Sequence, residues 1–148
     1  MSLQNWLAEG LLVSHAAPRT EILNLLALGE QDLTQCELPG LDPEWKLSIA
    51  YNAALRAATA ALAAAGCRAP NKEGHHYVVL QSLAFTVGLD EDTVRKLDVL
   101  RKKRHNATYG ATGAVSDREA EEALRLISSI CARVRAWLQA KHSELAGE

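Results

Sequence analysis

The sequence is poor in the residue types that build β-sheets and disulfide frameworks. Aromatic residues make up 5% of its 148 residues, and Phe85 is the single phenylalanine. Few segments therefore have the aromatic and β-branched enrichment that strands prefer. The three cysteines, Cys36, Cys67 and Cys131, contain no CxxC pair and do not make an even set. We therefore expect reduced thiols in a cytoplasmic protein.

Long apolar runs are missing as well. A transmembrane helix needs roughly 18 or more apolar residues, whereas the most apolar stretch, Ala53 to Ala65, is shorter and contains Arg56. The N-terminus does not show the basic segment followed by an apolar segment that is typical of a secretory signal peptide. We therefore expect neither a membrane partner nor a signal peptide.

Neither sign of charge dominates the chain. Its 16 basic and 18 acidic residues give a formal net charge of −2, so any binding to nucleic acid or to an anionic membrane needs a local basic patch. The sequence contains no GxSxG, P-loop or GxGxxG motif, which argues against nucleotide hydrolysis by those routes. We expect no cofactor.

Metal ligands are also not arranged as a site. His75 and His76 are adjacent, and neighbouring residues of a helix point roughly 100° apart. They cannot hold one metal together as a pair four residues apart could. We therefore expect no metal site.

Alanine and leucine dominate the composition, and both favour helices. Prolines, glycines and capping residues divide the chain into about six helical segments, at residues 2–14, 20–36, 43–65, 75–87, 90–109 and 116–145. Short loops between long helices favour antiparallel neighbours. The sequence predicts an all-α, up-and-down antiparallel bundle of four main helices plus shorter ones, in a single domain over residues 1–148. The alanine-rich segment 43–65 is expected at its centre.

Two helix starts carry specific signals. Asp42 is a favourable N-cap residue, and Pro43 suits the first position of a helix. The sequence from Ser116 to Glu119 is a capping box, in which each side chain can bond to the backbone N–H of the other residue. The acidic residues at 90–92 favour the start of the helix predicted over residues 90–109, because negative charge stabilises the positive N-terminal end of a helix dipole.

The basic run 101–105 is the most unusual segment. Val94, Leu97 and Leu100 form an apolar stripe at helical spacing, and Arg101 and Arg104 continue that stripe. Because an unpaired buried arginine is costly, the two arginines are expected to line a groove, meet carboxylates or face a second subunit. The alternative is a solvated helix end whose cations complement the helix dipole.

Polar residues also interrupt the alanine-rich segment. Tyr51, Asn52 and Arg56 lie within one turn or so of each other. Asn52 and Arg56, which are four residues apart, are either satisfied polar groups of the core or part of a polar groove that faces the helix of Arg104.

Several fragments together resemble the HEPN superfamily (higher eukaryotes and prokaryotes nucleotide-binding domain). The fragments that carry the resemblance are residues 42–45, 50–55, 65–68, 74–76 and 101–110. In order and spacing they are similar to small stand-alone HEPN-like proteins, over roughly residues 22–138. The resemblance implies a four- or five-helix bundle that usually dimerises and often works beside a nucleotidyltransferase-type partner.

Catalytic HEPN proteins are metal-independent ribonucleases whose motif is an arginine, an adjacent polar residue, four to six further residues and a histidine. Arg104 matches the arginine, and His105 or Asn106 matches the polar residue, but Tyr109 stands where the histidine is expected. Tyrosine, with a reference pKa near 10, exchanges protons poorly at neutral pH. The resemblance implies catalytic roles for Arg104, His105 and Tyr109 if the chain is an enzyme.

The leading hypothesis is a dimeric HEPN-like module that binds RNA, a nucleotide or a protein partner through an arginine-lined groove, in a toxin–antitoxin-like or defence setting. The residues expected to bind are Arg101, Arg104, Asn106, Asn52, Arg56 and His76. One alternative is a metal-independent endoribonuclease with a non-standard motif. The other is a purely structural helical bundle.

Overall fold

The structure is a computed structural model that describes residues 2–109 and 115–141, without the side chains of residues 107–109 and 141. Its helices are α1 (Leu3–Ala8), α2 (Arg19–Gln35), α3 (Pro43–Ala64), α4 (His75–Gln81), α5 (Leu83–Thr86), α6 (Glu91–Tyr109) and α7 (Asp117–Lys141). Its strands are β1 (Val13–Ser14) and β2 (Cys67–Arg68). The predicted break at residues 110–113 and the end of the last helix beyond residue 141 lie outside the described residues.

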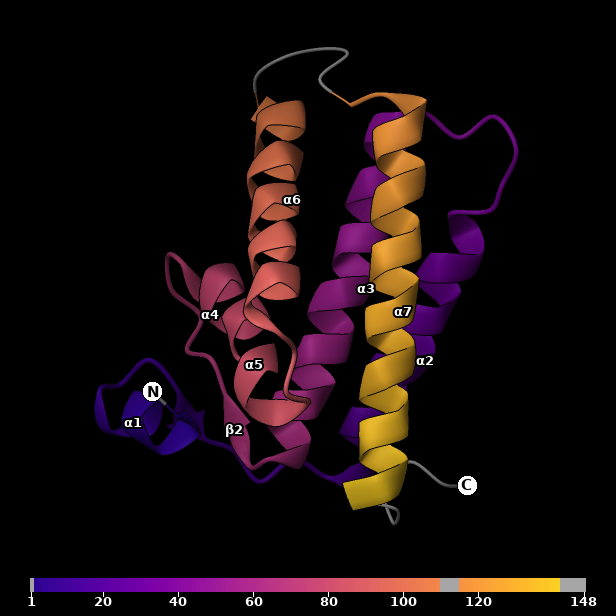
Figure 1. Cartoon of the computed structure of the whole chain (residues 1–148). Coiled ribbons are helices and arrows are strands. Elements are labelled where there is room, and N and C mark those ends of the chain that lie inside the picture. Colours follow the sequence, from indigo (N-terminus) through magenta and orange to yellow (C-terminus); the bar gives the residue numbers. More distant parts are fainter. Residues whose placement is uncertain (1, 110–114, 142–148) are drawn as a thin grey trace.

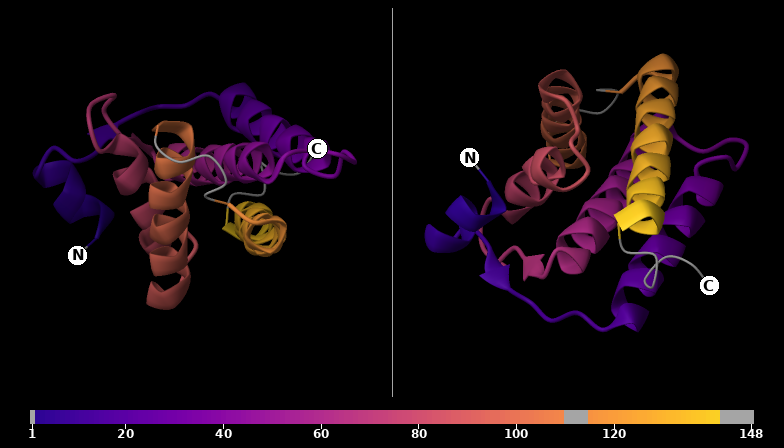
Figure 2. Two further views of the ribbon diagram at one scale, coloured as in Figure 1. Left: turned by 90° about the horizontal axis from the view of Figure 1, so that it is seen from above. Right: turned by 60° about the horizontal axis from the view of Figure 1, so that its bottom comes forward.

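The four long helices alternate in direction, as predicted. Figure 1 shows α2 and α6 running upward and α3 and α7 running downward. Seen from above in the left view of Figure 2, α2 and α7 lie on different sides of α3, and α6 crosses α3 near one end. The all-α bundle of four main helices with shorter additions is therefore confirmed.

Helix α3 forms the centre of the core because its side chains are small on several faces. Seven of its alanines are at most 3% exposed, namely Ala50, Ala53, Ala54, Ala57, Ala58, Ala60 and Ala61. Small side chains let α2 and α7 approach the α3 backbone closely, and dense packing of this kind is what a stable interior requires. The central position expected for this segment is confirmed.

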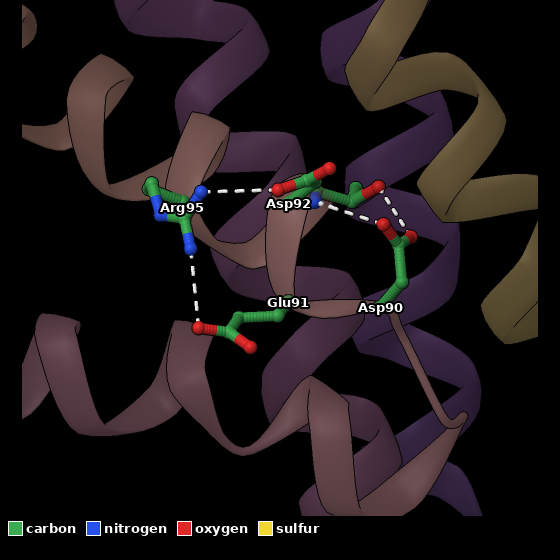
Figure 3. Close-up of polar contacts among 5 residues, drawn as sticks. Asp90, Glu91, Asp92 and Arg95 are labelled. Carbon is green, nitrogen blue, oxygen red and sulfur yellow. Dashed lines mark hydrogen bonds and ion pairs between the residues drawn. The ribbon is translucent and has the colours of Figure 1, made fainter.

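The starts of α6 and α7 have the predicted chemistry. The Asp90 carboxylate accepts hydrogen bonds from the Thr93 backbone N–H (3.3 Å) and hydroxyl (2.6 Å), as Figure 3 shows. In the first turns of α6, Arg95 pairs with Glu91 (3.1 Å) and Asp92 (3.0 Å). These contacts satisfy backbone donors and fix acidic charge at the positive end of the helix.

At α7 the capping box is formed. The Glu119 N–H donates to Ser116 Oγ (3.1 Å), and the Ser116 N–H donates to Glu119 Oε1 (3.0 Å). At α3 the helix begins at Pro43 after Asp42, as predicted, although the Asp42 side chain makes no capping hydrogen bond.

The first segment was predicted wrongly as one helix over residues 2–14. Helix α1 ends at Ala8, and Gly10 takes a left-handed conformation with φ of +78°. The chain then enters β1, which pairs antiparallel with β2 so that Val13 lies opposite Arg68. Residues 67–68 lie between two predicted helices, and two-residue strands are too short to give a periodic pattern that the sequence could reveal.

The predicted helix over residues 75–87 is interrupted. Ser82 is fully buried and its hydroxyl donates to the Val79 carbonyl at 2.6 Å. This local bond offers the backbone an alternative to continuous helix, and the segment is divided into α4 and α5. Within the described part of the chain, no helix is both long and apolar enough to cross a bilayer.

Candidate functional site

The basic end of α6 packs its arginines against aromatic rings. Val94 and Leu97 on the same face of α6 are 5% and 0% exposed, so this face turns toward the core. One and two turns after Leu97, Arg101 and Arg104 are half-buried. The stripe position predicted for these arginines therefore places them at the border between the core and solvent.

Arg104 lies over the ring of Tyr51, a residue of α3. Its Cζ atom is 5.4 Å from the ring centroid, within the range of a cation–π contact. Tyr51 itself is 0% exposed. The contact holds one face of the guanidinium group and leaves its donor edge to be satisfied by something else.

Arg104 also differs from its basic neighbours in its partners. Arg101 pairs with Asp98 at 2.8 Å, Lys102 pairs with Asp98 at 3.4 Å, and Lys103 pairs with Glu119. Within residues 2–106 and 115–140, no carboxylate pairs with Arg104, and its Nε atom is buried without a hydrogen-bond partner. An unsatisfied buried donor is unfavourable, so Arg104 Nε calls for an acceptor, such as a water, an ion or a ligand group.

Arg101 is held in place by two contacts. Its Nε donates to Asp98 at 2.8 Å, and its Cζ lies 5.5 Å from the centroid of the Tyr77 ring. Burial pushes the pKa of Asp98 upward, but the bonds and charges of Arg101 and Lys102 outweigh burial and hold this pKa below its ordinary value. Asp98 is therefore ionised at neutral pH and compensates the charge of Arg101.

His76, at the start of α4, reaches the same tyrosine from another side. The Tyr51 hydroxyl lies 3.5 Å from His76 Nδ1, a long hydrogen bond, and the two rings are 6.0 Å apart. Burial, followed by the positive charges of His75, Arg104 and Arg101, lowers the pKa of His76. Burial raises the pKa of Tyr51 to about 12, although Arg101 and Arg104 oppose this shift. At neutral pH, His76 is therefore mainly uncharged and Tyr51 keeps its proton.

We call this group of side chains from α3, α4 and α6 the Arg104 cluster. Its members are Tyr51, His76, Tyr77, Arg101 and Arg104. It contains three of the residues expected to bind. Its two tyrosines were not predicted as site residues, because no local spacing connects them with the arginines.

The other predicted site residues lie elsewhere. His105 and Asn106 are exposed on α6, and Asn52 is half-buried on α3. Arg56 turns to α2, where it donates to Asp32 (2.8 Å) and to the Leu28 carbonyl (3.3 Å). Arg56 therefore takes the role of a satisfied core group, one of the two alternatives. The side chain of Tyr109 lies outside the described residues.

The described residues contain no group of three or more histidine, cysteine or acidic side chains that could hold a metal ion. The Arg104 cluster offers cationic hydrogen-bond donors, a neutral imidazole and phenol rings. Such a set can bind an anion and orient it against aromatic faces.

The HEPN domain model matches residues 37–137 of the chain. The chain belongs to the HEPN family. The match runs from just before α3 to near the end of α7 and includes every member of the Arg104 cluster. It leaves α1, β1 and α2 outside. No curated protein and no solved structure matches the chain.

HEPN membership identifies the chain as a helical module of a family that is often linked to RNA. Arg104, which the resemblance aligned with the motif arginine, lies in the matched segment and is the cation without a carboxylate described above. The roles assigned to His105, Asn106 and Tyr109 stay predictions.

Proposed function

We propose that this HEPN protein binds RNA through its phosphate groups at the Arg104 cluster. One observation carries the proposal: Arg104 is a half-buried cation with a buried unpartnered Nε and no carboxylate beside it among the described residues. The neighbouring cations Arg101, Lys102 and Lys103 all have acidic partners. Among these four cations of α6, Arg104 is therefore the one with which an anion could form an ion pair without displacing a carboxylate of the protein.

Phosphate suits the geometry of this arginine. A guanidinium group presents parallel N–H donors in its plane, and a phosphodiester accepts two of them at once. Tyr51 covers one face of Arg104, so approach is favoured along the donor edge. Arg101 adds a second cation one turn away on the same helix. With only a few phosphate contacts, binding should be of modest affinity and sensitive to salt.

A dimer would make the site two-sided. HEPN domains usually dimerise with their motif arginines in a shared cleft, and the unpartnered donor of Arg104 is consistent with a site completed by a second copy. We propose the homodimer as the binding form. A nucleotidyltransferase-type protein is the partner that the family setting suggests.

The test is equilibrium binding of a fluorescent single-stranded RNA to the wild type and to Arg104→Ala. Hydrogen bonds to charged groups contribute about 1.5–3 kcal/mol, so Arg104→Ala should weaken binding by roughly tenfold or more. The matched control is Arg95→Ala, which removes the same charge from an exposed position of α6. Light scattering should give the mass of a dimer for all three proteins. Equal losses in the two variants, or no binding by the wild type, would refute the proposal.

The endoribonuclease alternative has one observation in its favour. His76 has a lowered pKa and lies at the same phenol ring as Arg104. A neutral imidazole can accept the proton of a ribose 2′-hydroxyl as that oxygen attacks phosphorus and the 5′-oxygen leaves. Cleavage in EDTA that is lost in His76→Ala and Arg104→Ala, and retained in His105→Ala, would favour this alternative. Loss in His105→Ala would instead favour the predicted motif residues.

A further inference from the structure

A separate cavity of about 320 Å³ lies beside the first turn of α4 and is lined by His75. Its walls come from α3, from β2 and the loop that follows, from α4, and from the segment around the start of α2. Its polar lining residues are His15, Glu21, Thr59, Arg68, Asn71 and His75. The volume is in the range of pockets for small organic ligands.

The N-terminal segment builds one side of this cavity. The His15 backbone N–H donates to the Gly66 carbonyl at 2.8 Å, directly after the β1–β2 pair. The His15 ring then contacts Glu21 in the first turns of α2. Both residues precede position 37, where the family match begins. The cavity is therefore an addition of this chain to the matched HEPN segment.

The hydrogen-bond pattern shows which groups remain for a ligand. His15 Nε2 lies 2.7 Å from Glu21 Oε2, and a carboxylate oxygen accepts, so His15 donates. Glu21 Oε1 has no bonded partner among the described residues. His75 Nδ1 lies 3.0 Å from the Lys72 carbonyl and must donate to it, and in the tautomer with the proton on Nδ1 the other nitrogen, Nε2, is an acceptor. The rim thus offers acceptors at Glu21 and His75 to the N–H donors of a ligand, while the Arg68 guanidinium and the Asn71 amide add donors.

The floor of the cavity is apolar. Leu62, Ala63, Val79 and Cys67 are at most 6% exposed and line it. Burial raises the pKa of the Cys67 thiol, so the floor is uncharged. An apolar floor with both acceptors and donors at its rim suits a flat heteroaromatic ring whose edge carries N–H groups as well as acceptor atoms.

We propose that this cavity binds a nucleobase and that the Glu21 carboxylate selects guanine. Guanine presents N1–H and the N2 amino group side by side, a donor pair that a carboxylate accepts. Adenine and the pyrimidines lack this pair, and hypoxanthine lacks the amino group. The Asn71 amide can donate to the guanine O6 acceptor.

The cavity and the Arg104 cluster meet at α4. His75 lines the cavity, and its ring centroid is 4.4 Å from that of His76, which contacts Tyr51. A guanine nucleotide could reach the cavity free in solution or as part of an RNA strand whose phosphates bind at Arg104. The second source rests on the proposed function, and the first does not.

The test compares guanosine and inosine monophosphates on the wild-type protein by isothermal titration, because the two ligands differ only in the N2 amino group. Wild type should bind the guanine nucleotide about tenfold more tightly, the value of one hydrogen bond to a charged acceptor. Glu21→Gln should abolish this preference. Glu30→Gln, which changes another α2 carboxylate that is paired with Arg135 at 2.6 Å, should retain it.

Oligoribonucleotides containing a single guanosine or inosine distinguish the two sources. Preference in the mononucleotides supports a free ligand, and preference that appears only in the strands supports a base within RNA. Arg104→Ala should lower the affinity for all strands while leaving the preference for guanosine over inosine unchanged. An affinity that does not change in Arg104→Ala would therefore contradict the proposed function without contradicting guanine selection in the cavity. No preference for guanine over hypoxanthine in either form would overturn the proposal, whether or not the Glu21 variant folds.

Discussion

Lys103, near the end of α6, forms an ion pair with Glu119, in the first turn of α7. Glu119 also accepts from the Ser116 N–H through its other oxygen. One carboxylate therefore closes the capping box of α7 and links that helix to α6. The hydrogen bond from Lys103, followed by that from Ser116, holds the pKa of Glu119 below its ordinary value. Both links should weaken as pH falls through the range in which this carboxylate is protonated.

Replacing the cap residue should destabilise the protein. In Ser116→Ala the Glu119 N–H loses its acceptor, and such caps contribute about 1 kcal/mol. The melting temperature should fall by roughly 2–4 °C. Ser129→Ala is the control, since the Ser129 hydroxyl bonds only to a carbonyl of its own helix, α7. Calorimetry that finds equal melting temperatures for the two variants would contradict this role of the capping box.

Two substitutions of Tyr51 should distinguish the contribution of its ring from that of its hydroxyl. Tyr51→Phe removes a long hydrogen bond to His76 and should cost less than about 1.5 kcal/mol, with little change in RNA binding because the ring under Arg104 remains. Tyr51→Ala leaves a large cavity at a fully buried position and should cost about 3–5 kcal/mol. Urea unfolding gives both values. A weakening of RNA binding in Tyr51→Phe as large as that in Arg104→Ala would show that the hydroxyl, rather than the ring, matters.

His76 should make stability depend on pH. Its pKa is lowered from 6.5, first by burial and then by His75, Arg104 and Arg101. Between the lowered value and 6.5 the unfolded chain binds more protons than the folded one, so the free energy of unfolding falls as pH falls through this window. Above the window the contribution is constant.

The measurement is urea unfolding at several values between about pH 5 and pH 8. His76→Gln should have a flatter pH dependence than the wild type. The groups that face His76 are His75, Tyr51, Arg101, Arg104 and, beyond them, Asp98. An unchanged slope in His76→Gln would mean that His76 titrates alike in the folded and unfolded chains.

Gly29 offers a stabilising change. It lies inside α2 and is buried, and a Cβ atom added there would sit 3.7 Å from the Ala53 carbonyl oxygen and 3.9 Å from Arg56 Cβ, ordinary contact distances. Gly29→Ala should therefore stabilise the protein by about 0.5–1 kcal/mol through helix propensity. Gly66→Ala should destabilise it, because φ there is +84°. Thermal melts in which Gly29→Ala unfolds earlier than the wild type would show that α2 and α3 leave no room for a methyl group.

Local signals predicted most of the fold. The helix propensity of the α3 alanines, the Ser116–Glu119 capping box and the acidic charge at the start of α6 are all local properties. Each depends on residues that are close together in the sequence, so each can be predicted from composition and spacing. The strand pair Val13–Arg68 joins residues 55 positions apart and involves too few residues to give a pattern. Likewise, Gly10 marked the end of α1 only once its left-handed conformation was known.

The site was predictable in part for the same reason. The helical stripe from Val94 through Leu97 placed Arg101 and Arg104 at the edge of the core. Their aromatic contacts depend on how α3 and α4 pack against α6, which no spacing within one helix encodes. Which of the predicted residues bind a ligand stays a prediction.

The packing of α2 on α3 has a practical consequence for anyone who expresses part of this chain. A fragment cut at the boundaries of the family match, residues 37–137, would lose Ile22 and Leu26 from the interior and Asp32 from its bond with Arg56. The alanine face of α3 would then be open to water, and alanine-rich helices without a cover tend to associate. We expect such a fragment to aggregate, and any oligomer it forms would say little about how the whole chain assembles.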